Sequence, residues 1–103
     1  MADTGALVLL SDLVDRLDTL GNESTIFARK PWSAMSEAVL VATDDEGRID
    51  RAVPAGFAYF LEVNVSREVL EVFGDRPASL GDRTRLLIYY AEFDSFPDWV
   101  YEH

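Results

Sequence analysis

The sequence predicts an α+β fold: an antiparallel sheet of three to four strands with about three helices packed on one face. One helix-like segment precedes the strand-like segments and two follow them, an order that is typical of this class. The connections between the strand-like segments are too short to hold the crossover helices that parallel strands need. A length of 103 residues predicts a single globular domain over residues 1–103.

The first element is predicted to be a helix that begins at Ser11. Serine is a favourable N-cap, and Gly21 is a residue type that commonly follows a helix end. Between them, apolar residues recur at helical spacing, so they should form the face that packs on the sheet. These residues are Leu10, Leu13, Val14, Leu17 and Leu20.

Two strands and a possible hairpin are predicted next. Thr25–Arg29 is a strand candidate, and Lys30–Ser36 is predicted to be a loop. Glu37–Thr43 is apolar on both faces, which indicates a covered, central position in the sheet. Asp44–Gly47 has the composition of a turn, so Arg48–Val53 could extend the pairing into a hairpin.

The clearest strand pattern covers Phe57–Val65, where residues of two kinds alternate. One face is predicted to carry Phe57, Tyr59, Leu61, Val63 and Val65, and the other Ala58, Phe60, Glu62 and Asn64.

Two helices are predicted in the last third of the chain. The first begins after a cap at Ser66 and ends at Gly74. The second begins at Ser79, has Asp82 at a spacing like that of a capping box, and ends near Phe93. Because this last helix is apolar over more than one face, we expect it to be the most buried helix or to lie partly under a partner.

Composition excludes several kinds of chemistry. The chain has no cysteine, and its single histidine is the terminal residue His103. Disulfides, thiolate nucleophiles and cysteine metal sites are therefore excluded, and no Walker loop, G-x-G-x-x-G or H-E-x-x-H motif occurs. We predict a protein that is not an enzyme, with no catalytic residue, no metal site and no cofactor.

Two arrangements keep a catalytic alternative open. Glu92 and Asp94 could form an acid–base or metal-binding pair, although a pair two residues apart on a helix points to different sides. Lys30 could serve as the base for Ser33 or Ser36. A carboxylate-based enzyme is accordingly the least favoured of three hypotheses.

The charge balance indicates the kind of partner. The chain has 19 acidic and 9 basic residues, a net charge of −10. Such a surface repels phosphate backbones and attracts basic proteins, so we expect a basic protein partner and no direct nucleic-acid binding. The longest apolar run, Leu86–Ala91, is far too short to span a membrane. The first basic residue, Arg16, comes too late for a secretory signal, so we expect no membrane association and a cytoplasmic location.

The segment from Tyr89 to Glu102 is the candidate binding site. It contains six aromatic and four acidic residues and no basic residue. Aromatic rings supply rigid contact area, and neighbouring carboxylates can pair with lysine and arginine. The predicted partner-binding residues are Tyr89, Tyr90, Glu92, Phe93, Asp94, Phe96, Asp98, Trp99 and Glu102. The alternative is that these rings complete the core while the acids face water.

With these properties the chain resembles bacterial immunity proteins, which are often small, acidic and free of cysteine. Its segment Leu87–Phe96 is also similar to a segment of small bacterial proteins. The resemblance implies a cytoplasmic protein that neutralises a toxin domain of a polymorphic or contact-dependent inhibition system, and it assigns a role to no individual residue. A small accessory or regulatory domain that acts as a homodimer is the second hypothesis.

Overall fold

The computed structural model describes residues 8–42, 53 and 55–102. Its elements, in chain order, are β1 (Val8–Leu9), α1 (Leu10–Asp15), the 3₁₀ turn η1 (Leu17–Thr19), β2 (Ser24–Arg29), β3 (Glu37–Ala42), β4 (Phe57–Glu62), α2 (Val63–Leu70), η2 (Glu71–Phe73), α3 (Leu80–Phe93) and η3 (Asp98–Glu102).

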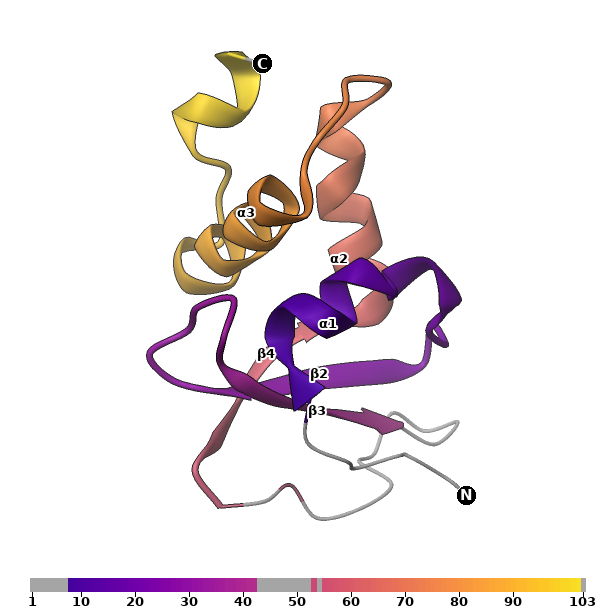
Figure 1. Ribbon diagram of the computed structural model, residues 1–103, viewed down its shortest axis with the longest axis vertical. Helices are drawn as coiled ribbons and strands as arrows, with labels where there is room; N and C mark the ends of the chain where they lie inside the picture. The colour runs from indigo at the N-terminus through magenta and orange to yellow at the C-terminus, as the bar shows by residue number, and fades with distance from the viewer. Residues whose placement is uncertain (1–7, 43–52, 54, 103) are drawn as a thin grey trace.

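The described strands form one sheet with helices on one side of it. The strand order is β1-β3-β2-β4, and every neighbouring pair is antiparallel. Figure 1 shows α1, α2 and α3 above the same face of this sheet. The predicted α+β class, the antiparallel sheet and the placement of the helices are therefore confirmed. None of the described helices has the length and apolar character needed to cross a bilayer.

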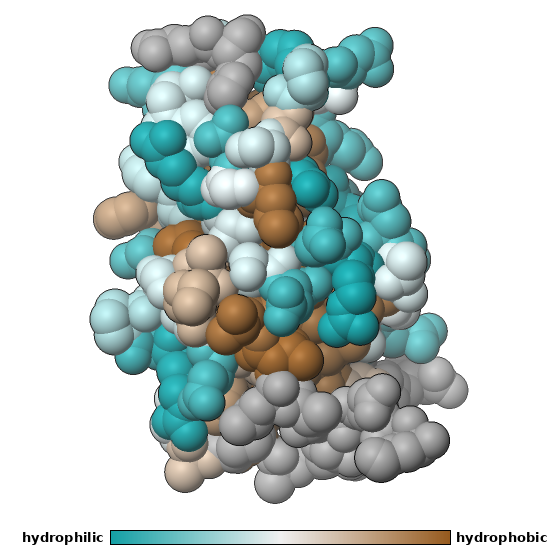
Figure 2. Space-filling view, in the orientation of Figure 1, coloured by the Kyte–Doolittle hydropathy of each residue, from teal (hydrophilic) through white to brown (hydrophobic). Residues whose placement is uncertain are grey.

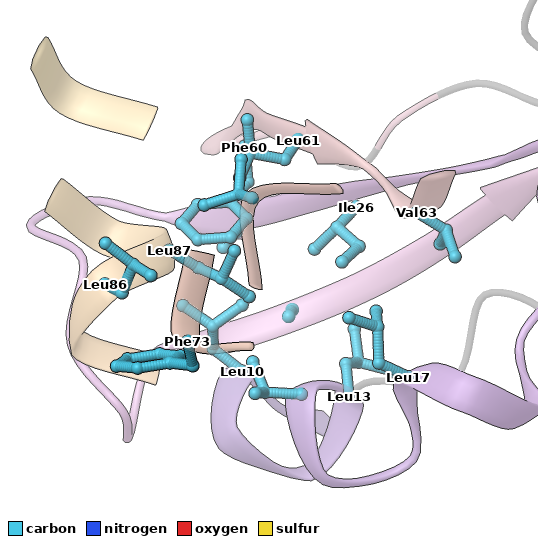
Figure 3. Close-up of a cluster of buried hydrophobic side chains, with 14 of the residues drawn as sticks. Leu10, Leu13, Leu17, Ile26, Phe60, Leu61, Val63, Phe73, Leu86 and Leu87 are labelled. Atoms are coloured by element: carbon cyan, nitrogen blue, oxygen red, sulfur yellow. The ribbon is translucent and has the colours of Figure 1, made fainter. Parts of the chain in front are cut away.

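The main core lies between the sheet and the helices. It draws fully buried side chains from α1, β2, β4 and α3, and Figure 3 shows how they converge. Of the residues predicted to form the apolar face of the first helix, Leu10, Leu13, Val14 and Leu17 are buried and Leu20 is half-buried. The predicted helix end at Gly21 is wrong, because α1 ends at Asp15 and Leu17 lies in the separate 3₁₀ turn η1.

A second, smaller cluster covers the other face of the two inner strands. Phe27, Val39 and Val41 are buried there, and Val53 and Phe57 pack against them. The Phe27 ring also meets the Tyr59 ring edge to face at 6.1 Å. Since β3 is buried on both faces and lies between β1 and β2, its predicted central position is confirmed.

The predicted alternation of Phe57–Val65 is wrong beyond Tyr59. Ile26 pairs with Leu61 and the next residue, Phe27, pairs with Tyr59, so Phe60 is an extra residue in a β-bulge. A bulge breaks the period of two, and Phe60 and Leu61 therefore both reach the main core. The strand also ends three residues early, because α2 begins at Val63.

Two of the three predicted serine caps are wrong. Ser11 lies inside α1, which begins at Leu10 directly after β1. The amides of Leu10 and Ser11 donate to the carbonyls of Ser36 and Ala34, at 2.8 and 3.1 Å, so loop backbone caps this helix. Ser66 lies inside α2 and donates from its hydroxyl to the Glu62 carbonyl at 3.0 Å.

The predicted bounds of α3 are confirmed. The Ser79 hydroxyl accepts a hydrogen bond from the Asp82 amide at 3.0 Å, which is the cap that the spacing predicts. The helix runs to Phe93 and ends at Asp94, whose φ of 55° places it in the left-handed region. The end of the preceding helical segment at Gly74 is also confirmed, whereas the turn at 44–47 and most of the hairpin extension at 48–53 lie outside the described residues.

Gly56 should be intolerant of any side chain. Its φ is 88°, and a Cβ there would lie 2.5 Å from a guanidinium nitrogen of Arg29. We expect Gly56→Ala to lower the free energy of unfolding by about 1–3 kcal/mol, because the left-handed backbone becomes strained and Arg29 must leave its place over Phe57. Urea unfolding followed by circular dichroism measures the change.

Gly81→Ala is the matched control for this substitution. Gly81 lies in the first turn of α3, and the nearest atom to a new Cβ there is the Ser79 hydroxyl at 3.7 Å. Alanine should therefore raise the free energy of unfolding by about 0.5–1 kcal/mol. Equal effects of the two substitutions would contradict the assigned backbone conformation at Gly56.

Candidate partner-binding site

An arginine and a valine help to hold the C-terminal segment against the body of the protein. Val100 of η3 is fully buried in the main core. The Arg76 guanidinium donates to the carbonyls of Val72 and Phe73 at 2.6 and 2.9 Å and to that of Val100 at 3.2 Å. These bonds tie η3 to the end of the α2–η2 unit.

Three of the predicted anchor rings are mainly part of the core. Tyr90, Phe96 and Trp99 are half-buried and pack against the main cluster. The rings of Tyr90 and Phe96 lie 5.3 Å apart, which closes the turn after α3. For these three residues the structure supports the alternative reading, in which the aromatic side chains complete the core.

The pair formed by Tyr89 and Phe93 faces solvent. The two rings lie one helical turn apart on α3 with centroids 4.6 Å from each other. Phe93 is 60% exposed, and Tyr89 is half-buried. α3 is therefore not the most buried helix, since only Thr84, Leu86 and Leu87 are buried along its 14 residues.

Acidic residues lie next to Phe93 in the chain, at Glu92 and Asp94, and Asp98 begins η3. Glu92, Asp94 and Asp98 are all exposed, and the side chain of Glu102 lies outside what the structure describes. Tyr101, which was not assigned to the site, is 63% exposed. On the face shown in Figure 2, hydrophilic side chains prevail and apolar ones form separate patches.

The fold brings cations next to this acidic segment, which the sequence prediction missed. The Arg85 guanidinium lies 4.1 Å from the centroid of Trp99. Arg85 precedes Tyr89 by four residues, and this helical spacing could have indicated their shared side of α3. Lys30 lies in the loop between β2 and β3, which is distant in the sequence, and no local pattern indicates that this loop lies near α3.

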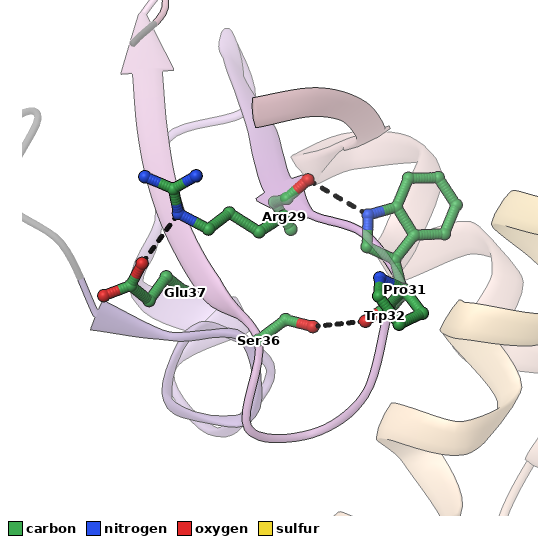
Figure 4. A network of polar contacts seen from close by, with 6 residues as sticks. Arg29, Pro31, Trp32, Ser36 and Glu37 are labelled. Atoms are coloured by element: carbon green, nitrogen blue, oxygen red, sulfur yellow. Dashed lines mark hydrogen bonds and ion pairs between the residues drawn. The ribbon is translucent and has the colours of Figure 1, made fainter. Parts of the chain in front are cut away.

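A hollow of about 370 Å³ lies between this loop and α3, lined by Lys30, Pro31, Trp32 and Glu92. The Trp32 indole N–H donates to the Ala28 carbonyl at 3.1 Å, as drawn in Figure 4. The ring meets Phe60 edge to face at 5.0 Å, and the Lys30 ammonium lies 4.7 Å from its centroid. The hollow thus combines a fixed indole, a cation and a carboxylate.

The serine hydroxyls beside Lys30 hold the loop together. The Ser36 hydroxyl accepts from the Ser33 amide at 2.8 Å and donates to the Pro31 carbonyl at 3.2 Å. The Ser33 hydroxyl accepts from the Met35 amide at 3.2 Å. Lys30 is directed to the Trp32 ring, so these contacts give the serines a structural role in the loop.

Other titratable groups add little to this site. Burial and the neighbouring Glu62 carboxylate raise the pKa of the Tyr59 hydroxyl, which lies on β4 and faces away from the helices. Within residues 8–42, 53 and 55–102, no three acidic or histidine side chains are grouped so as to hold a metal ion. The candidate site is therefore built from rings, carboxylates and the 30–32 loop.

The fold and this surface define a four-stranded antiparallel α+β protein with an acidic, ring-bearing helix end. No protein-family model, curated protein or solved structure matches the chain.

Proposed function

We propose that this chain is a non-catalytic acidic binding protein that receives a basic protein at the end of α3. The observation that supports it is the Tyr89–Phe93 pair, 4.6 Å apart with Phe93 60% exposed, on a segment that also carries the exposed Glu92, Asp94 and Asp98. A large ring in water gains about 1.5–3 kcal/mol when it becomes fully buried, so the pair can anchor a partner while the carboxylates orient it.

The biological role we propose is that of an immunity or antitoxin-type protein. A nuclease-type toxin presents a basic surface to bind phosphates, and a protein with a net charge of −10 can occupy such a surface in place of the nucleic acid. Opposite charges accelerate encounter, and this acceleration weakens as salt screens it. Occlusion of the toxin's active site needs no chemistry from the chain itself.

The proposed role predicts a neighbouring gene for a secreted protein with a toxin-type C-terminal domain, and the test uses that domain as the partner. The triple substitution Glu92→Gln, Asp94→Asn and Asp98→Asn should slow association with that domain by about tenfold or more at low salt. Asparagine at position 94 keeps the left-handed helix end, because Asn adopts that conformation readily. Surface plasmon resonance at several salt concentrations measures the association rate and its salt dependence.

The matched control neutralises three exposed acids elsewhere, with Asp15→Asn, Asp18→Asn and Glu68→Gln. Both triple variants change the net charge equally, so a difference between them reports position alone. The control should change the association rate by about twofold or less. Equal effects of the two variants would show that the end of α3 is not the binding site, and a toxin domain that binds neither variant nor the wild type would reject the immunity role.

Self-association is the second hypothesis, and it rests on the same exposed ring. A stable dimer buries about 1,200–2,000 Å² in total, which would have to include Phe93. We expect sedimentation equilibrium to give a monomer at micromolar concentrations. A dimer that dissociates on Phe93→Ala would favour the homodimeric accessory domain instead.

A further inference from the structure

We propose that the hollow between the Lys30–Trp32 loop and α3 binds an arginine side chain of the basic partner. This inference rests on the proposed function and adds to it the residue that the partner inserts. The hollow shares Glu92 with the surface at the end of α3 and extends that surface toward the sheet.

The Trp32 indole forms a fixed wall of the hollow. Its N–H is already used by the Ala28 carbonyl, and its perpendicular contact with the Phe60 ring holds the ring plane. Figure 4 shows the loop that presents this ring, with Ser36 bonded to the Pro31 carbonyl. Because the indole N–H is already hydrogen-bonded, a ligand would contact the face of the ring, and this face attracts cations.

Lys30 shows that a cation fits at this position. Its ammonium lies 4.7 Å from the Trp32 ring centroid, and its flexible, exposed stem lets it leave. An exposed contact of this type shifts an equilibrium only about two- to fivefold. Lys30 therefore acts as an internal occupant that a better cation can displace.

Glu92 favours arginine as that better cation. The carboxylate lines the hollow and is exposed, and within the part of the chain that the structure describes it makes no ion pair. A guanidinium can stack flat on an indole and donate two parallel hydrogen bonds to a carboxylate. An ammonium is more strongly hydrated and cannot form this forked arrangement, so lysine should bind more weakly than arginine.

The experiment titrates the protein with N-acetylargininamide and follows the two tryptophan indole N–H signals by NMR. The chain has only two tryptophans, and Trp99 already carries Arg85 over its ring. We expect a saturable shift of the Trp32 signal at millimolar ligand and little change at Trp99. N-acetyllysinamide should bind less tightly, and Glu92→Gln should weaken binding about fivefold, whereas Glu68→Gln should leave it unchanged.

Lys30→Gln gives the sharpest test. Removal of the internal occupant should tighten binding of N-acetylargininamide about two- to fivefold. Arg16→Gln, which removes an exposed charge at the C-cap of α1 and changes the net charge equally, should not tighten binding. The amide spectra of all variants report whether the fold is retained.

Three results would overturn the proposal: no saturable shift at Trp32, weaker binding by the Lys30→Gln variant, or binding of N-acetylaspartamide in place of the arginine ligand. The last would mean that Lys30 recognises an anion. If the pocket fails in this way while the triple acid variant still slows association with the toxin domain, the arginine pocket is rejected and the proposed function stands.

Discussion

Phe60→Ala should lower the free energy of unfolding by about 3–5 kcal/mol, the usual loss for a buried ring. Phe60 is 1% exposed and occupies the bulge of β4, where it packs against the main core and the edge of Trp32. Alanine would leave a cavity between the sheet and the helices that Leu61 cannot fill, because Leu61 already has its own place in the cluster. Urea unfolding monitored by circular dichroism measures the loss.

Phe93→Ala is the matched control, since it removes the same side chain from a site that is 60% exposed. Its effect on the free energy of unfolding should stay within about 0.5 kcal/mol, as expected for a surface position. The same variant should weaken binding of the toxin domain. We therefore expect Phe60→Ala to lower stability and Phe93→Ala to weaken binding. Comparable losses of stability at both positions would contradict the described burial.

Arg67→Met should lower the free energy of unfolding by about 2–4 kcal/mol. From α2, the guanidinium donates to the Leu17 carbonyl at 2.9 Å and also to the Leu20 carbonyl and the Asn22 side-chain oxygen. Methionine keeps most of the apolar stem but removes all three bonds, of which those to the Leu17 and Leu20 carbonyls are partly buried, and bonds from a charged donor contribute about 1.5–3 kcal/mol each. Differential scanning calorimetry and urea unfolding both measure the loss.

Arg16→Met is the control for charge, because Arg16 is exposed at the end of α1. It removes one positive charge with little loss of contact and should change stability by about 0.5 kcal/mol or less. If the two arginine variants were equally stable, the bonds between α2 and η1 would contribute nothing net. Folded Arg67→Met protein should still bind the toxin domain, since Arg67 lies outside the candidate site.

Local patterns predicted the elements whose signals lie within a few residues. The spacing of Ser79 and Asp82 predicted the start of α3, because the capping hydrogen bond joins residues three apart. The run of apolar residues from Ala38 to Val41 predicted burial of β3 on both faces, because a strand covered on both faces carries apolar side chains at successive positions. In both cases the residues that decide the structure lie within or next to the element itself.

Elements whose contacts come from elsewhere in the chain were predicted incorrectly. Ser11 has the chemistry of a cap, but the loop carbonyls of Ala34 and Ser36 cap α1 instead. The period of two in Phe57–Val65 cannot reveal that Phe60 is an extra residue, because a bulge is defined by pairing with β2.

For the candidate site, the sequence by itself determined the charge, the number of rings and the absence of cysteine. Only the tertiary structure decided which rings are available: Tyr90, Phe96 and Trp99 pack on the core, whereas Phe93 stays exposed. It also brought Lys30 and Trp32 beside Glu92, some sixty residues away in the chain. The physical reason is that composition is a property of residues, while exposure and proximity depend on which surfaces the packed elements leave uncovered.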